Sequence, residues 1–307
     1  MKIAIIGSGL VGSTTAYSLA VTGLARELVL CDIDRTKAEA ETLDILHATP
    51  YTFPCRIKSG SYKDMSGSDI IIITAGIHQK PGETRLELFE KNIEIFKDIV
   101  KGIVTYAADS LILAASNPVD LLTSYIAKEA KLPFSRIIGS GTILDTARFR
   151  SILGNHLQLA PQSIHAYVLG EHGDSEVLIW SEALAGNMPL ESFAAQAGIS
   201  LNAEVKNHID SEVRNSAYKI IAGKGATYYG IAAGLTRICK AIAYNENAIL
   251  TVSVHHDEIE GVENICLSLP AVINHDGIHR ILYPELSASE HALLRQSAEK
   301  IRDYIHN

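Results

Sequence analysis

Three side chains in the second half of the chain have the types and spacing for acid–base and anion chemistry. His172 lies between Gly170 and Gly173 in the segment GEHGDSE, after a predicted strand and outside any clear helix. An imidazole there could exchange a proton near neutral pH, and a buried carboxylate could fix its tautomer. In ILDTARFR, Asp145 and Arg148 are three residues apart, so they project from one face of a helix. Arg148 could hold a substrate carboxylate through two parallel hydrogen bonds.

Each of these features also has a simpler interpretation. A histidine in a turn is more often a surface residue. A carboxylate and an arginine three residues apart are more often a salt bridge on a helix. Spacing alone therefore leaves the chemistry of His172 and of the Asp145–Arg148 pair open.

A glycine-rich turn near the start of the chain indicates a dinucleotide site. GSGLVG places Gly7, Gly9 and Gly12 after a predicted strand and at the opening of a predicted helix. The first glycine permits the tight turn, the second the approach of a pyrophosphate, and the third close packing of helix on strand. Asp32 ends the second predicted strand, where an acid accepts hydrogen bonds from a ribose and favours NAD over NADP. The alternative is a glycine turn followed by an aspartate that only caps a helix.

The elements that must position these residues differ between the two halves of the chain. In the first half, short aliphatic runs alternate with helical patterns, which is typical of a parallel sheet covered on both faces. We therefore predict a Rossmann-type, doubly wound α/β domain over residues 1–143 and an α+β substrate domain over 144–307. The expected strands of the first half are 2–7, 27–31, 55–60, 69–75, 110–116 and 136–140.

Composition narrows the class of protein. The chain has 307 residues and a formal net charge of −8, which argues against sequence-independent binding to nucleic acid. Its four cysteines have no metal-like spacing, so we expect no metal site and a reducing, cytoplasmic compartment. No run approaches the roughly 18–20 apolar residues that a membrane span needs.

Taken together and in order, the motifs resemble those of the L-lactate/L-malate dehydrogenase family, of the bacterial type. The resemblance runs over nearly the whole chain, and it rests on the segments GSGLVG, TAG…QKPGETR, SNPVD, IGSGTILDTARFR, GEHGDSE and KGATYYGIA. It implies that His172 is the proton donor and acceptor with Asp145 as its partner, and that Arg148 anchors the substrate carboxylate. It further implies that Arg85 polarises the reacting carbonyl. Asn117 of SNPVD would contact both substrate and nicotinamide, with a bond to Pro118 that is often cis in this family.

The same resemblance implies which residues bind the cofactor NAD. Beyond the three glycines, Asp32 and Asn117, the expected contacts are Leu10, Val11, Lys37, Tyr62, Gly76, Ile77, Ala115, Ser116 and Ser140.

One position in GIHQKPGETR separates the substrates of this family. A malate enzyme carries an arginine there to pair with the second carboxylate, whereas the aligned residue here is Gln79. A neutral side chain leaves that carboxylate unpaired, at a cost of several kcal/mol. Lys80, adjacent and cationic, complicates this argument, while Thr227 is also lactate-like. We expect NADH-dependent reduction of pyruvate to L-lactate. The alternatives are malate dehydrogenase activity and a non-catalytic NAD-binding module.

Two further residues suggest regulation. Arg150 and His165 match, by resemblance, a pair that binds fructose 1,6-bisphosphate across a subunit interface in many bacterial relatives. An arginine and a partly protonated histidine suit a phosphate. Some relatives keep both residues without strong activation, so activation stays open. By the same resemblance we expect a homo-oligomer, a tetramer.

Overall fold

The computed structural model describes residues 1–77 and 85–306. Its helices are α1 (Leu10–Val21), α2 (Arg35–Ala48), α3 (Arg85–Tyr106), α4 (Val119–Glu129), α5 (Ile143–Leu157), α6 (Leu190–Ala197), α7 (Ala203–Lys224), α8 (Tyr229–Ala243) and α9 (Ala288–His306). Its strands are β1 (Lys2–Ile6), β2 (Glu27–Cys31), β3 (Arg56–Gly60), β4 (Ile70–Ile73), β5 (Leu111–Ala114), β6 (Ile137–Gly139), β7 (Ile164–Leu169), β8 (Val177–Ala185), β9 (Met188–Pro189), β10 (Ala248–Ile259), β11 (Val262–Asn274) and β12 (Gly277–Ile281).

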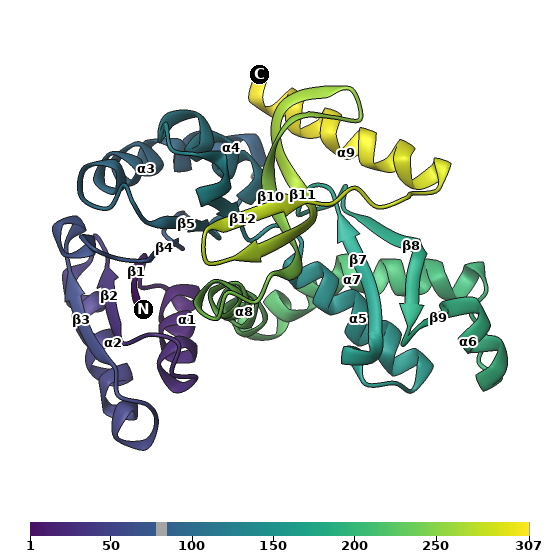
Figure 1. Cartoon of the computed structure of the whole chain (residues 1–307), viewed down its shortest axis with the longest axis horizontal. Helices are drawn as coiled ribbons and strands as arrows, with labels where there is room; N and C mark the ends of the chain where they lie inside the picture. Colours follow the sequence, from purple (N-terminus) through teal and green to yellow (C-terminus); the bar gives the residue numbers. More distant parts are fainter. Residues whose placement is uncertain (78–84, 307) are drawn as a thin grey trace.

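The six strands expected in the first half are confirmed, and they pair in parallel. Their order across the sheet is β3-β2-β1-β4-β5-β6. The strands stay parallel, but the order in which the chain adds them reverses between β1 and β4, as in a doubly wound sheet. Aliphatic side chains fill both faces because helices cover both. Ile3 and Ile5 of β1 pack with α1, α2 and α8, whereas Ala4 and Ile6 pack with α3 and α4. Figure 1 shows these helices on opposite sides of the sheet.

The second half of the chain extends this sheet, which the sequence did not indicate. β10 pairs antiparallel with β6 at Ser253 and Gly139, and β11 and β12 continue the antiparallel order, so one sheet has nine described strands. A parallel sheet that ended at β6 would expose unpaired backbone groups, and β10 covers them. Helix α8 also returns to the first half, where Thr236 Oγ1 donates to Ser18 Oγ at 2.9 Å.

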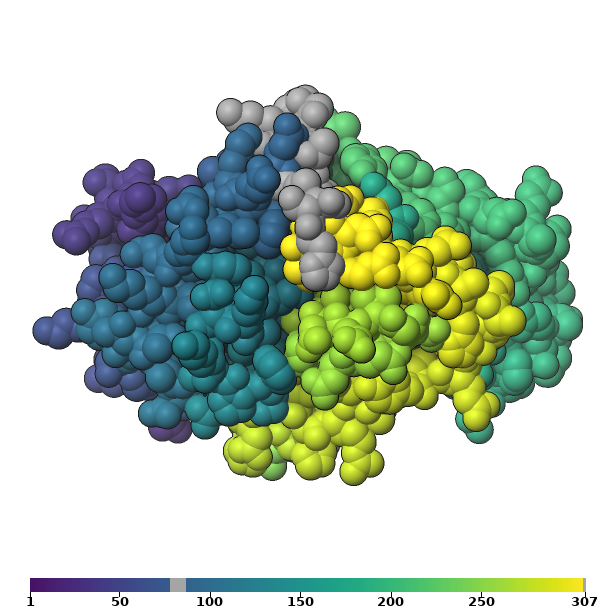
Figure 2. Space-filling model, turned by 90° about the horizontal axis from the view of Figure 1, so that it is seen from above, coloured from purple at the N-terminus to yellow at the C-terminus, as the bar shows by residue number. Residues whose placement is uncertain are grey.

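A second layer carries the residues with acid–base potential. β7, β8 and β9 form a three-stranded antiparallel sheet, and helices α5, α6 and α7 bury a separate core against it around Phe149, Leu153 and Val213. Helix α9 closes the other side of β8 through Leu294, Ala298 and neighbouring residues. Figure 2 shows this C-terminal part, in yellow, between the N-terminal half and the green residues of the second half. No helix among the residues in the structure is long and apolar enough to cross a membrane.

Several of the expected cofactor residues gather at one edge of the large sheet. In a parallel sheet the carboxyl ends of the strands share an edge, and ligands bind there where the strand order reverses. The glycine turn follows β1, Asp32 follows β2, Gly76 and Ile77 come shortly after β4, and Ser140 follows β6. The fold thus brings together residues that are far apart in sequence.

Candidate active site

The turn between β1 and α1 has the shape that a dinucleotide pyrophosphate requires. Gly7 has φ +103°, and a Cβ added there would lie 2.5 Å from the backbone nitrogen of Ala75. A Cβ on Gly12 would lie 1.9 Å from the carbonyl oxygen of Gly7, so helix and strand are in the closest contact that glycine allows. Gly9 is the N-cap of α1 and makes no side-chain cap, and a Cβ added to it would meet no described atom within 4 Å. Its open side is therefore a cradle at the N-terminus of α1, which attracts an anion.

Asp32 is placed to accept hydroxyl donors beside this turn. Its Oδ2 accepts the backbone N–H of Ser8 at 2.5 Å, and its Oδ1 accepts the backbone N–H of Asp34 at 3.0 Å. A carboxylate has about four acceptor sites, so capacity remains for a ribose. These bonds also mean that Asp32 fixes the turn itself. Asp34, and not Asp32, caps α2 by accepting the N–H of Lys37 at 3.0 Å.

A buried amide joins the ends of β4 and β5. Asn92 of α3 accepts the N–H of Ile77 at 2.8 Å through Oδ1, and its Nδ2 donates to the carbonyl of Asn117 at 3.0 Å. Ser116 Oγ donates to the carbonyl of Ala75 at 2.5 Å. The Asn117–Pro118 bond is cis, as the resemblance implied. The motifs did not point to Asn92, because an isolated asparagine inside a helical pattern gives no signal.

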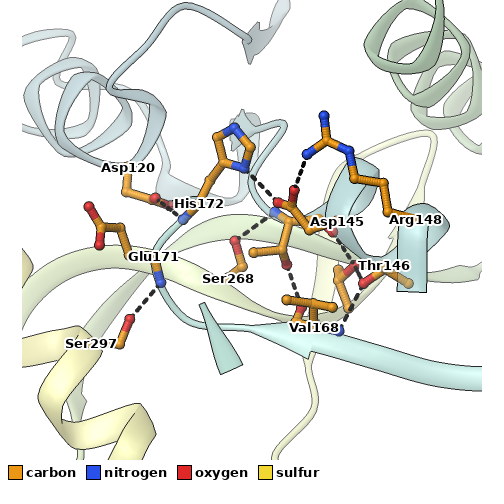
Figure 3. A network of polar contacts seen from close by, with 11 residues as sticks. Asp120, Asp145, Thr146, Arg148, Val168, Glu171, His172, Ser268 and Ser297 are labelled. Atoms are coloured by element: carbon orange, nitrogen blue, oxygen red, sulfur yellow. Dashed lines mark hydrogen bonds and ion pairs between the residues drawn. The ribbon is translucent and has the colours of Figure 1, made fainter. Parts of the chain in front are cut away.

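His172, Asp145 and Arg148 form one cluster (Figure 3). His172 Nδ1 lies 2.5 Å from Asp145 Oδ2, and Arg148 Nη1 donates to Asp145 Oδ1 at 2.7 Å. The histidine comes from the segment between β7 and β8, here called the His172 loop (residues 170–176), and the other two come from the first turns of α5. Asp145 is therefore both the partner of His172 and one half of a salt bridge on the helix. The salt bridge and the histidine partnership, which the sequence analysis gave as alternative interpretations, occur in the same cluster.

The electrostatics of this cluster favour a charged aspartate and an oriented imidazole. Asp145 is 1% exposed. Burial alone would raise the pKa of Asp145, but the charges and hydrogen bonds of His172 and Arg148 outweigh burial and hold it below its ordinary value. The side chains of His172 and Arg148 keep 23% and 12% of their surface exposed. Both can therefore reach a ligand while Asp145 stays behind them.

Asp120 is a third carboxylate of this region, to which the sequence motifs assigned no role. Its Oδ2 accepts the backbone N–H of His172 at 2.8 Å, which ties the His172 loop to the first turn of α4 (Figure 3). It is 2% exposed. Burial raises the pKa of Asp120 to about 6. In sequence, Asp120 looks like an ordinary acid in the first turn of a helix. Only its position as the last residue of SNPVD could have indicated that it belongs to the site.

Glu176 is a fourth carboxyl group close to the cluster. Ligand atoms of Asp145, His172 and Glu176 lie within 4.8 Å of one another, as they do in many metal sites. Both oxygens of Asp145 are already engaged by His172 and Arg148, and the guanidinium adds a positive charge. Burial, with the charge of Asp145, raises the pKa of Glu176 to about 8. The arrangement therefore suits a proton better than a metal cation.

The His172 loop is anchored on its far side by α9. The backbone N–H of Glu171 donates to Ser297 Oγ at 2.7 Å (Figure 3). Lys300 Nζ lies 3.0 Å from the carboxylate of Glu171. Gly170 exchanges two backbone hydrogen bonds of 3.0 Å with Ser268 of β11. Helices α4, α5 and α9 and strand β11 thus hold one loop in place.

Several expected site residues lie at the margin of this region or outside it. Thr227 is half-buried just before α8, whose Gly230 packs against Leu144, the neighbour of Asp145. Tyr62 packs its ring on Gly102 of α3. Gln79 lies outside the described residues. Arg85 begins α3, and its side chain is likewise outside the described part of the structure.

Arg150 lies on α5, the helix that carries Asp145 and Arg148, and His165 lies on β7, which precedes the His172 loop. Arg150 Nε donates to the carbonyl of Ala166 at 2.9 Å, and its guanidinium lies 5.5 Å from the ring centre of Tyr167. Burial lowers the pKa of Arg150. His165 is exposed on β7, and the pairing of β7 with β8 shifts its register between His165 and Tyr167.

A doubly wound parallel sheet with a glycine turn for a dinucleotide, joined to a layer that holds a His–Asp–Arg cluster, defines a nicotinamide-dependent dehydrogenase. Residues 1–139 match the family model of the lactate/malate dehydrogenase NAD binding domain, and residues 142–307 match that of the alpha/beta C-terminal domain. The chain belongs to the lactate/malate dehydrogenase family.

Relatives of nearly the same length support this assignment. The chain is 51% identical to an L-lactate dehydrogenase of Thermus aquaticus, with 98% of this chain and 97% of the relative covered. It is 50% identical to one of Allorhizobium ampelinum, with 99% and 98% covered. Among solved structures, the lactate dehydrogenase MGS-M5 from a deep-sea metagenome library of the Medee basin superimposes with a TM-score of 0.95 at 42% identity, covering 99% of this chain and 98% of the other.

Proposed function

We propose that this chain is an NAD-dependent L-lactate dehydrogenase that interconverts pyruvate and L-lactate. The observation that carries the proposal is the single cluster in which Asp145 binds His172 with one oxygen and Arg148 with the other. The cluster provides a proton-exchanging group and an anion-binding group at a fixed separation. Relatives named L-lactate dehydrogenase along the full length of the chain support the choice of substrate.

The roles we propose follow from what each side chain can do. Bound NADH supplies the hydride. Arg148 binds the substrate carboxylate through the guanidinium nitrogens that remain available and so orients the keto group. His172, protonated on both ring nitrogens, donates the proton of Nε2 to the keto oxygen, while Nδ1 stays bonded to Asp145. Asp145 holds the tautomer and stabilises the imidazolium.

The first half of the chain has the corresponding task for the cofactor. We propose that Gly7, Gly9 and Gly12 receive the pyrophosphate and that Asp32 receives the adenosine ribose. The open side of Gly9 and the spare acceptor sites of Asp32 support this assignment. We propose the division into an NAD domain, 1–143, and a catalytic domain, 144–307, with which the two family-model matches are consistent. We propose that the other expected cofactor contacts also bind NAD: Leu10, Val11, Lys37, Tyr62, Gly76, Ile77, Ala115, Ser116, Asn117 and Ser140.

For the substrate, the proposed discrimination rests on Gln79 and Thr227, with Arg85 at the carbonyl. A direct test compares NADH oxidation with pyruvate and with oxaloacetate. We expect kcat/KM for pyruvate to be the larger. A larger value for oxaloacetate would establish a malate dehydrogenase, and no NADH oxidation with either would overturn the proposal of an enzyme.

We further propose a cytoplasmic homotetramer that fructose 1,6-bisphosphate activates through Arg150 and His165. The remaining donors of Arg150 and the exposed side chain of His165 support a phosphate site. Light scattering would measure the oligomer. Titration with fructose bisphosphate should lower KM for pyruvate in the native chain and leave it unchanged in the His165→Gln variant. An equal response in both would remove His165 from the site.

A further inference from the structure

The last residue of the His172 loop is a buried acid with a fixed backbone. The N–H of Glu176 donates to the carbonyl of Gly173 at 3.0 Å, and its own carbonyl accepts Nη2 of Arg214 at 2.8 Å. Glu176 is 5% exposed, and its Oε1 has no hydrogen-bond partner among the residues the structure describes. A buried acceptor left in this way is costly unless it carries a proton or lies in a compensating field.

The groups around Glu176 come from three elements. Asp145 and Arg148 face it from α5, His172 from its own loop, and Arg214 from α7. Arg214 is largely occupied, because its Nε donates to Asp210 at 2.5 Å and its Nη1 to the carbonyl of Asp174 at 2.9 Å. The nearest charges that change during turnover are therefore those of His172 and of the substrate carboxylate on Arg148.

Glu176 and His172 are close enough for the charge of each to alter the other. Their ligand atoms and those of Asp145 lie within 4.8 Å of one another, and both carboxyl groups are buried, where charges interact more strongly than in water. A negative charge on Glu176 favours the imidazolium, and a protonated Glu176 removes that support. Burial, with the charge of Asp145, raises the pKa of Glu176 to about 8, so Glu176 loses its proton above neutral pH.

We propose that Glu176 is a positioning residue for the proton of His172: it ionises as the pH rises and thereby keeps His172 protonated further into the alkaline range. The idea rests on the proposed function of His172. Its consequence is directional, because pyruvate reduction needs the imidazolium and lactate oxidation needs the neutral ring. Glu176 would extend the first reaction to higher pH and delay the second.

The test replaces the titrating group with a neutral one of the same shape. In Glu176→Gln we expect the alkaline fall of kcat/KM for pyruvate to occur about one pH unit lower, leaving about a tenth of the native value on that limb. The rise of kcat/KM for lactate should move in the same direction. Glu182→Gln, at an exposed position of β8, removes the same charge and should leave both profiles unchanged.

A second readout is independent of the substrate. Diethyl pyrocarbonate modifies neutral imidazoles, and mass mapping of the peptide that contains His172 would follow its modification rate against pH. In Glu176→Gln this rate should rise about one pH unit lower than in the native chain. If the native chain does not reduce pyruvate, the proposed function is overturned, but the modification rate of His172 still tests the effect of Glu176.

Profiles and modification rates that coincide in Glu176→Gln and the native chain, or a shift to higher pH, would overturn the proposal. If the glutamine variant fails to fold, Glu176→Met provides the same comparison, because it removes the unpartnered carboxyl and keeps an unbranched side chain. For this variant, too, an unchanged profile counts against the coupling.

Discussion

Alanine at Gly9 and at Gly12 should separate cofactor binding from folding. At Gly9 the backbone has φ −73° and ψ −174°, which alanine adopts, and the added Cβ meets no described atom within 4 Å. At Gly12 the Cβ would meet the Gly7 carbonyl oxygen at 1.9 Å and Thr74 Oγ1 at 2.7 Å. The two substitutions add the same methyl group within one turn, yet their expected outcomes are opposite.

The expected magnitudes follow from those distances. Gly9→Ala should change the free energy of unfolding by less than about 1 kcal/mol, because the lower entropy of the unfolded chain with alanine offsets the preference for glycine over alanine at the N-cap. It should weaken NADH binding at least about tenfold, which corresponds to about 1.4 kcal/mol, because the methyl group occupies the cradle of the pyrophosphate. In Gly12→Ala the Gly7 carbonyl must retreat by about an ångström, so we expect about 3 kcal/mol or more of destabilisation.

Fluorescence titration with NADH and denaturation in urea measure the two effects separately. Gly9→Ala should lose affinity with little change in the urea midpoint, and Gly12→Ala should unfold at a lower urea concentration even without cofactor. Native affinity in Gly9→Ala would show that the open side of this residue is not the pyrophosphate site. A native urea midpoint in Gly12→Ala would refute the packing argument.

Two other substitutions test the His172 cluster, and a third tests the buried carboxyl group of Asp120. His172→Asn should abolish turnover while NADH still binds by fluorescence titration; unchanged turnover would exclude the proposed proton transfer. Arg148→Lys should lower kcat/KM for pyruvate at least about 100-fold, because a single ammonium cannot form two parallel hydrogen bonds; a value close to native would refute carboxylate binding there. The raised pKa of Asp120, about 6, means that its ionisation opposes folding as the pH rises from about 4 to 6. Asp120→Asn should therefore add about 3 kcal/mol to the free energy of unfolding at pH 8, since each pKa unit corresponds to about 1.4 kcal/mol, with little change at pH 4; urea denaturation at both pH values measures it.

The sequence predicted the elements of the first half closely because local signals agree there. The run Ile70–Ile73 is entirely aliphatic and becomes a fully buried central strand, and the glycines of GSGLVG fall where β1 turns into α1. The helix predicted from the spacing of Asp145 and Arg148 is α5, which runs from Ile143 to Leu157.

What the sequence could not predict depends on contacts between distant segments. Strand β10 joins the sheet beside β6, antiparallel to it, through the residue pair Ser253 and Gly139. No local sequence pattern encodes this contact. The bonds from Asn92 to Ile77 and Asn117 and from Asp120 to the backbone of His172 are of the same kind. The pairing of His172 with Asp145 followed from the resemblance, whereas residue types alone left it open.

The anchoring of the His172 loop by α9 has a consequence for synthesis of the protein. A ribosome releases the chain from its N-terminus, and the glycine turn and its six parallel strands emerge long before residues 288–306. Ser297 and Lys300, which hold Glu171 beside His172, emerge only after all six of these strands. A nascent chain would thus acquire the fold that holds a dinucleotide before it acquires a set proton donor. The catalytic site would therefore form after the dinucleotide site, as a separate step in the folding of each molecule.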